Sequence, residues 1–219
     1  MSNICRFAGL CLIAGLSSIG CIEFPGEPVM PTWDVQVSAA LAKTSHSIRD
    51  LVSDIASLPP EVLDTLDLSR MTVRYENNVI MGDTTGDGKN DSGLTGDFFK
   101  TVTQAHIFVE AVNGTPAALD LSLSILDQDG VTLLVIPALD SPLHLTPAPL
   151  DQTGKVGAPT TARATVNVDD GLASVFETGK SLTYAIDITF PENVRMTHVL
   201  SSDSLFIQTW GTFVARVDP

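Results

Sequence analysis

The residues best suited to chemistry lie in the acidic run Met81–Gly93, which reads MGDTTGDGKNDSG. Hard Ca²⁺ prefers six to eight oxygen ligands, which side chains at alternate positions and a backbone carbonyl at the seventh place direct inward, while a glycine at the sixth place permits a sharp turn. The run follows this order from its first to its ninth place. The sequence therefore predicts a Ca²⁺ loop whose candidate ligands are Asp83, Thr85, Asp87, Lys89 and Asp91.

Within this run, GDTTGDGKND resembles the short acidic loops of FG-GAP repeats, thrombospondin type 3 repeats and dockerins. Carried over by position, the resemblance implies binding through the side chains of Asp83, Asp87 and Asp91 and through the carbonyl of Lys89. Such a site is expected to be structural before it is functional. The alternative is an ordinary solvated turn, because Asp, Asn, Gly and Thr are common in turns.

Two residues depart from the pattern of these loops. Thr85 stands where Asp or Asn is usual, and Leu94 stands where a full helix-loop-helix site has its bidentate Glu. An EF-hand proper is therefore not expected. Asp97, outside the run, is a candidate for a further ligand.

The first 20 residues have the plan of a secretory signal peptide, with Arg6 before an apolar run and small residues before Cys21. The apolar run is shorter than the ~20 residues that a spanning helix needs. The segment before Cys21 resembles the lipobox of bacterial lipoproteins, although Ser18 replaces the usual large aliphatic residue. That resemblance implies cleavage before Cys21 and its acylation, with several chains including palmitate. The alternatives are secretion of a soluble protein, after an ordinary signal-peptidase cut at the same bond, and a plain hydrophobic N-terminus.

Cysteine usage fits the same reading, because Cys5 and Cys11 would leave with the leader. Cys21 would then be the single cysteine of the mature chain, which excludes an internal disulfide. We therefore expect lipidation at Cys21 and a membrane anchor, in an outer-membrane lipoprotein of the bacterial cell envelope.

Net charge limits the partners. The chain carries a net charge of −14, with 26 acidic and 12 basic residues, and loss of the leader with Arg6 makes it −15. A strongly acidic protein repels phosphate backbones, so we expect no nucleic-acid partner. A protein or glycan partner at the cell surface is compatible with this charge.

The chain after Cys21 begins with a proline-rich tether over 21–33. The run PTWDVQV, which begins at Pro31 near the end of the tether, resembles the start of a recurrent type of uncharacterised bacterial surface lipoprotein, which implies no particular activity. Residues 34–69 are expected to form an N-terminal adjunct with a short strand at 33–37. An amphipathic helix over 44–58 is also expected there, with Ser47 and Asp50 at the spacing of a capping box.

Residues 70–219 are predicted to form the main domain. Apolar and polar residues alternate along several segments, most cleanly at Leu119–Ile125, which predicts strands that bury one face. A hairpin is expected at Asp127–Gly130. Seven or more such strands favour a mainly β protein, an antiparallel β-sandwich of the immunoglobulin-like or jelly-roll type. The expected strands are 71–76, 105–111, 119–125, 131–136, 162–168, 182–190, 195–200 and 205–217, with a short helix within 170–179.

No catalytic motif is present in the sequence. The four histidines are far apart and form no HExxH pair, and neither a GxSxG elbow nor a Walker loop occurs. The sequence therefore predicts a non-enzymatic structural or interaction module. The alternative is a carbohydrate- or ligand-binding module, with Trp33, Trp210, Tyr75 and Tyr184 as residues that could stack on a sugar.

Overall fold

The computed structural model describes residues 33–52, 57–63, 65–85, 87–93, 96–136, 141–168, 175–195, 199 and 202–217. Asp34–Val217 form one compact unit. The leader, Cys21 and most of the tether lie outside the described residues. Among the described residues, no helix is long and apolar enough to span a membrane.

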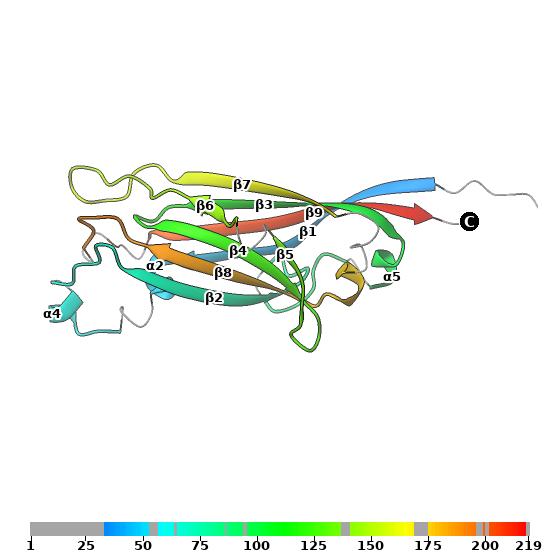
Figure 1. Ribbon diagram of the computed structural model, residues 1–219, viewed down its shortest axis with the longest axis horizontal. Helices are drawn as coiled ribbons and strands as arrows, with labels where there is room; N and C mark the ends of the chain where they lie inside the picture. Colours follow the sequence, from blue (N-terminus) through cyan, green and yellow to red (C-terminus); the bar gives the residue numbers. More distant parts are fainter. Residues whose placement is uncertain are drawn as a thin grey trace, which may run out of the picture. The chain divides into compact units, whose positions relative to one another are not determined.

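The described strands form two sheets, which lie as two layers (Figure 1). The first has the strand order β1-β9-β3-β7, and the second has the order β2-β8-β4-β5, with β6 paired to β4. The pairings of β3 with β7 and β9, and all those of the second sheet, are antiparallel. The strands are β1 (Trp33–Ser47), β2 (Thr72–Ile80), β3 (Val102–Asn113), β4 (Ala118–Leu126), β5 (Thr132–Ile136), β6 (Leu143–Leu145), β7 (Thr160–Val168), β8 (Ser181–Thr189) and β9 (Ser204–Val217).

The strand order identifies the type of sandwich. Apart from the short β6, the strands pair first with last and inward from there: β1 with β9, β2 with β8, β3 with β7 and β4 with β5. A long hairpin of four strand pairs that rolls into two layers gives this order, which is that of a jelly roll. The predicted fold class, a mainly β antiparallel sandwich, is confirmed, and the jelly roll replaces the immunoglobulin-like alternative.

The core lies between the two sheets, where every second side chain of each central strand is buried. In β4, Leu119, Leu121, Leu123 and Ile125 are fully buried, as their alternation predicted. Their partners on β8 are buried as well, with Leu121 opposite Ile186. Each such side chain contributes about 1.5–3 kcal/mol by leaving water, so this alternation fixes which face of each strand is inside.

The helix expected over 44–58 is much shorter than predicted. Residues 44–47 belong to β1, and the helix α2 covers Ile48–Leu51. The predicted capping box is present, because Asp50 N donates to Ser47 Oγ (3.2 Å) and Ser47 N donates to Asp50 Oδ2 (3.2 Å). The capping signal therefore marked where the helix begins, while pairing of β1 in the first sheet extended the strand up to that point. Residues 53–56 lie outside the described residues.

The remaining expectations are met in part. The hairpin at Asp127–Gly130 joins β4 to β5. Residues 175–178 are helical, and 169–174 of the expected helix lie outside the described residues. Of the strand expected over 195–200, residues 195 and 199 are described, and Arg195 forms an isolated bridge with Asp67. The helices α4 (Pro60–Leu63) and α5 (Gly96–Phe99) are short, and β1 brings part of the expected adjunct into the first sheet.

Candidate metal site and polar pocket

The acidic loop begins where β2 ends and is attached to β1. Gly82 N donates to the carbonyl of Leu41, and Asp83 forms a parallel bridge with Ala42. Leu41 and Ala42 are both buried, so the alternation of β1 is interrupted where the loop attaches. The loop closes on itself at the same point, because Asp91 N donates to the Gly82 carbonyl (2.8 Å). The backbone thus holds both ends of the loop at the β1 edge.

Asp83 holds the inside of the loop together. Its side chain is buried, with 3% of the residue exposed. One carboxylate oxygen accepts from Thr85 N (3.1 Å) and the other from Gly88 N (2.9 Å). Gly88 reaches this position with φ of 80°, in the left-handed region that favours glycine. The glycine predicted at the sixth place therefore makes the turn.

The structure brings three predicted ligands together. Carboxylate oxygens of Asp83, Asp87 and Asp91 all lie within 4.8 Å of one another, Asp83 buried and the other two exposed. The Thr85 hydroxyl joins them by donating to Asp91 Oδ2 (2.9 Å). Three carboxylates at this spacing repel one another, and a cation between them removes that repulsion. This aspartate group could hold a metal ion.

The side chains of Lys89 and Asp97 form ion pairs, Lys89 with Asp87 of the aspartate group and Asp97 with Lys100 outside it. Lys89 N donates to Asp87 Oδ1 (3.0 Å), and its ammonium lies 3.4 Å from Asp87 Oδ2. A cation at the aspartate group would compete with this ammonium for Asp87. Asp97, in α5, pairs instead with Lys100 at 2.8 Å, and that contact lowers the pKa of the Asp97 carboxyl.

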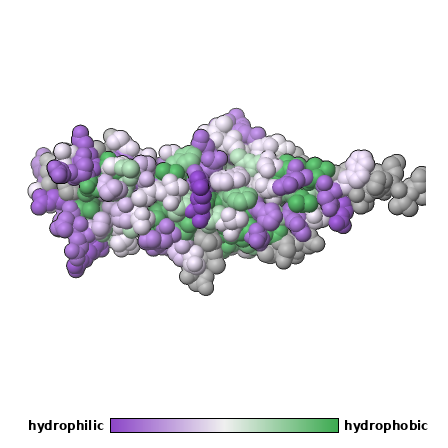
Figure 2. Space-filling model, turned by 90° about the horizontal axis from the view of Figure 1, so that it is seen from above, coloured by the Kyte–Doolittle hydropathy of each residue, from purple (hydrophilic) through white to green (hydrophobic). Residues whose placement is uncertain are grey.

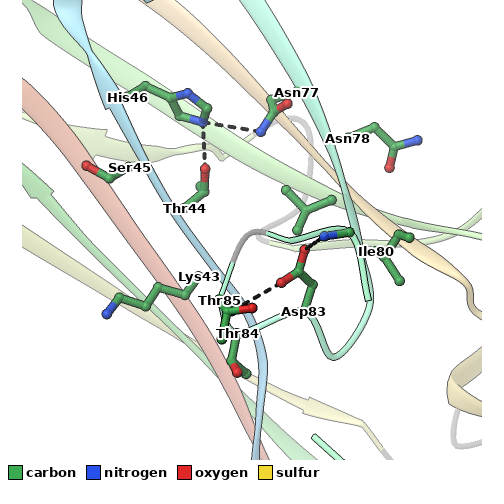
Figure 3. Close-up of a pocket in the computed structure, with 12 residues that line it drawn as sticks. Lys43, Thr44, Ser45, His46, Asn77, Asn78, Ile80, Asp83, Thr84 and Thr85 are labelled. Carbon is green, nitrogen blue, oxygen red and sulfur yellow. Dashed lines mark hydrogen bonds between the residues drawn. The ribbon is translucent and has the colours of Figure 1, made fainter. Parts of the chain in front are cut away.

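A polar pocket lies beside the loop, between β1 and β2 (Figure 3). Its cavity volume is about 970 Å³. Residues 43–46 of β1 form one wall, residues 77–80 of β2 form another, and Asp83–Thr85 with Gly88 contribute the acidic loop. No local sequence pattern predicted this pocket, because its walls come from strands that lie in different sheets.

His46 is the centre of a hydrogen-bond network in the pocket. Asn77 Nδ2 lies 3.2 Å from His46 Nε2. Nδ1 lies 3.3 Å from the Tyr75 hydroxyl, and the Thr44 hydroxyl lies 2.7 Å from Nε2. The imidazole also packs edge-on against the Tyr75 ring. Burial lowers the pKa of His46, while the negative charge of Asp50 acts in the opposite direction.

The four aromatic residues considered for sugar stacking lie in different environments. Tyr184 is fully buried in the core, where burial raises its pKa to about 12, so it is not available to stack on a sugar. Tyr75 belongs to the pocket network. Trp33 is exposed, and Trp210 lies on the outer face of the first sheet, stacked on Phe108 with ring centroids 5.5 Å apart. Hydrophobic and hydrophilic residues are interspersed on the face nearest β7 (Figure 2).

Two of the loop glycines, Gly82 and Gly88, give a first prediction. A Cβ at Gly88 would meet nothing within 4 Å, so Gly88→Ala should cost only the left-handed backbone strain, about 1 kcal/mol. A Cβ at Gly82, whose φ is also positive, would lie 2.3 Å from Asn90 Oδ1, which accepts from Ser92. Gly82→Ala should therefore lower the free energy of unfolding by more than Gly88→Ala. Urea denaturation measures both, and equal losses would contradict this account of the loop.

The buried imidazole gives a second prediction. Because the folded state lowers the pKa of His46 below 6.5, the unfolded state binds more protons near that pH. The stability contributed by neutral His46 is present above about pH 7.5 and is lost as the pH falls. Between pH 8 and pH 5.5, the wild type should therefore lose more unfolding free energy than His46→Gln. Parallel pH curves, or an imidazole NMR titration midpoint above 6.5, would contradict the prediction.

The comparisons with known proteins found distant structural similarities. No family model and no curated protein matches the chain. The chain is similar to a protein of Parabacteroides distasonis ATCC 8503 that is inferred to be secreted, at 7% identity over 74% of this chain and 47% of that one, with a TM-score of 0.46. It is also similar to the Gx strain structure of infectious bursal disease virus, at 11% identity over 85% of this chain and 33% of that one, with a TM-score of 0.33.

A third likeness is to the coat protein of tobacco streak virus, at 10% identity over 88% of this chain and 93% of that one, with a TM-score of 0.32. The chain thus spans about half of the P. distasonis protein and a third of the bursal virus chain. These identities and TM-scores are too low to transfer a function. The fold assignment rests on the strand order of the chain itself.

Proposed function

We propose that this chain is a lipid-anchored protein of the bacterial cell envelope, whose jelly-roll sandwich is a non-enzymatic interaction module stabilised by Ca²⁺. The observation that carries the calcium part is the aspartate group: three carboxylates within 4.8 Å, contributed by a nine-residue loop with glycine at its turn. Carboxylate and hydroxyl oxygens are the ligands that Ca²⁺ prefers. The anchor part rests on the lipobox-like segment before Cys21.

Calcium is preferred to Mg²⁺ because of the way the loop is built. Mg²⁺ demands near-ideal octahedral geometry, whereas Ca²⁺ accepts more ligands in a flexible arrangement. Asp83 is buried and fixed by two backbone N–H groups, while Asp87 and Asp91 are exposed and contact Lys89 and Thr85 of the same loop. Such an arrangement, fixed at one side and adaptable at the other, suits the larger ion.

Binding would stabilise the sandwich rather than perform chemistry. The loop is attached to Leu41 of β1 and follows directly on β2, so it spans the open edge between the two sheets. A cation that bridges the exposed aspartates to buried Asp83 would hold this edge closed. The absence of a catalytic motif in the sequence supports an interaction role, with a protein or glycan partner at the cell surface.

A thermal melt of the full chain with excess Ca²⁺ and with chelator tests the calcium site. The double variant Asp87→Asn, Asp91→Asn removes two charges from exposed side chains and leaves Asp83, which also holds the loop backbone, in place. At ~100 times the dissociation constant, Ca²⁺ should add about 2.7 kcal/mol. That corresponds to a rise of roughly 5–10 °C in the melting temperature for a domain of this size.

The rise should vanish in the double variant and persist in Asp129→Asn, a matched exposed aspartate in the β4–β5 turn. Identical melts with Ca²⁺ and chelator in the wild type would rule out the site. A rise that survives in the double variant would place the ion elsewhere.

The anchor has its own test. Cells grown with labelled palmitate should incorporate label into the wild-type chain and into Cys11→Ser, because Cys11 lies in the leader that is removed. Cys21→Ser should lose both the label and retention in the membrane fraction. Unchanged labelling of Cys21→Ser would refute the lipoprotein assignment and leave soluble secretion as the alternative.

A further inference from the structure

The open edge of the sandwich is polar where a core would be expected. β1 and β2 are the end strands of the two sheets, so their inner faces meet at one edge of the sandwich. On β2 the inward positions alternate, with Val73 and Val79 packed against the core and Tyr75 and Asn77 between them. Tyr75 and Asn77 both contact His46 of β1. Apolar side chains at these positions would stabilise the sandwich more simply, since polar groups lose their hydration there.

The network offsets that loss and also fixes the geometry. His46 is held from three sides by Thr44, Tyr75 and Asn77, at distances between 2.7 and 3.3 Å. A satisfied network of this kind holds its members in single orientations. The floor of the pocket is therefore ordered before any ligand arrives, which lowers the entropic cost of binding.

The composition of the walls selects the class of ligand. Hydroxyl and carboxamide groups, which both donate and accept hydrogen bonds, predominate, and there is one ammonium and one carboxylate. The apolar area comes from Val79 and Ile80 on β2. A phosphate-bearing ligand would be repelled by Asp83 and the neighbouring aspartates, and an apolar ligand would leave the polar groups unpaired. The polar lining residues are Lys43, Thr44, Ser45, His46, Asn77, Asn78, Asp83, Thr84 and Thr85.

We propose that this pocket binds a sugar unit of a glycan. A pyranose carries hydroxyl groups that donate and accept in the same way as the walls, and C–H groups that can pack on Val79 and Ile80. The volume, about 970 Å³, accommodates one or two sugar rings, and it falls within the range of ligand pockets. Figure 3 shows Thr44 and His46 on β1 turned toward Asn77 on β2, while Lys43 lies on the outer side of β1 and Asn78 on the outer side of β2. A ring at the mouth of the pocket would therefore meet groups of both strands, with Lys43 and Asn78 at its rim.

The inference rests on the interaction role in the proposed function and names a sugar as the ligand, but it needs neither the anchor nor Ca²⁺. It competes with a purely structural account, in which inward polar residues at an edge discourage pairing with other sheets. It also places a glycan at a different surface from Trp210, which lies on the outer face of the first sheet. Substitutions at the two surfaces separate these accounts.

Saturation-transfer-difference NMR on the full chain, with free glucose, galactose, mannose, N-acetylglucosamine, lactose and maltose as probes, tests the proposal. At least one probe should show a saturable signal. Asn78→Ala removes an exposed hydrogen-bonding group at the rim without touching the His46 network. It should weaken binding three- to tenfold, which is the effect of one hydrogen bond. Asn167→Ala, an exposed asparagine on β7, and Trp210→Ala should leave affinity unchanged.

Three results would overturn the proposal: no saturable signal from any probe, loss of binding in Trp210→Ala but not in Asn78→Ala, or equal loss in Asn78→Ala and Asn167→Ala. Each titration is repeated with chelator. Binding that persists there supports the sugar site even if the melts rule out Ca²⁺. Binding seen only with Ca²⁺ supports the pocket and assigns one wall of it to the ordered loop.

Discussion

The site depends on one consequence of the jelly-roll strand order, which leaves β1 and β2 at adjacent open edges of the two sheets. Pairing of β1 with β9 and of β2 with β8 closes one side of each of these strands, so β1 and β2 finish the two sheets next to each other with the other side open. An open sheet edge carries unpaired backbone groups and invites pairing with other chains. In this protein the acidic loop covers part of that edge, through Gly82 on Leu41 and Asp83 on Ala42. The edge therefore positions both the aspartate group and the pocket.

Asp83 connects these two features. Its carboxylate is buried, ties the loop to the N–H groups of Thr85 and Gly88, and also lines the pocket. Asp87 and Asp91 lie on the exposed side of the same loop. A cation bound by Asp87 and Asp91 would therefore also contact Asp83, whose position is already fixed by the backbone. Such binding should make the wall of the pocket at Asp83 more rigid without changing its conformation.

The sequence predicted what local patterns determine. Alternation located β4 and its inward residues, such as Leu121, because burial of one strand face imposes a period of two. Ser47 and Asp50 located the start of α2, since a capping box needs only neighbouring residues. The spacing of Asp83, Asp87 and Asp91 brought their carboxylates together for the same reason. Each of these signals acts within about ten residues.

What the sequence did not predict depends on contacts between distant segments. Residues 44–47 were predicted to begin the helix, yet they extend β1 because the first sheet receives that strand. The choice between jelly roll and immunoglobulin-like sandwich lies in the strand order, which alternation does not encode. Tyr184 was a candidate for the surface, but its place on β8 opposite Leu123 buries it. The pocket combines His46 with Asn77, which are 31 residues apart and in different sheets.

The contacts between these distant segments also allow the pocket to be polar. A residue on an inner face is normally selected for packing, and His46, Tyr75 and Asn77 would each lose hydration there if they stood alone. Together they satisfy one another, so no member can be replaced by an apolar residue without leaving its partners unpaired. The group is therefore stable only as a whole, and relative to an apolar edge it lowers the stability of the folded state. A function that uses these hydrogen-bonding groups, as sugar recognition does, gives a physical reason for keeping them.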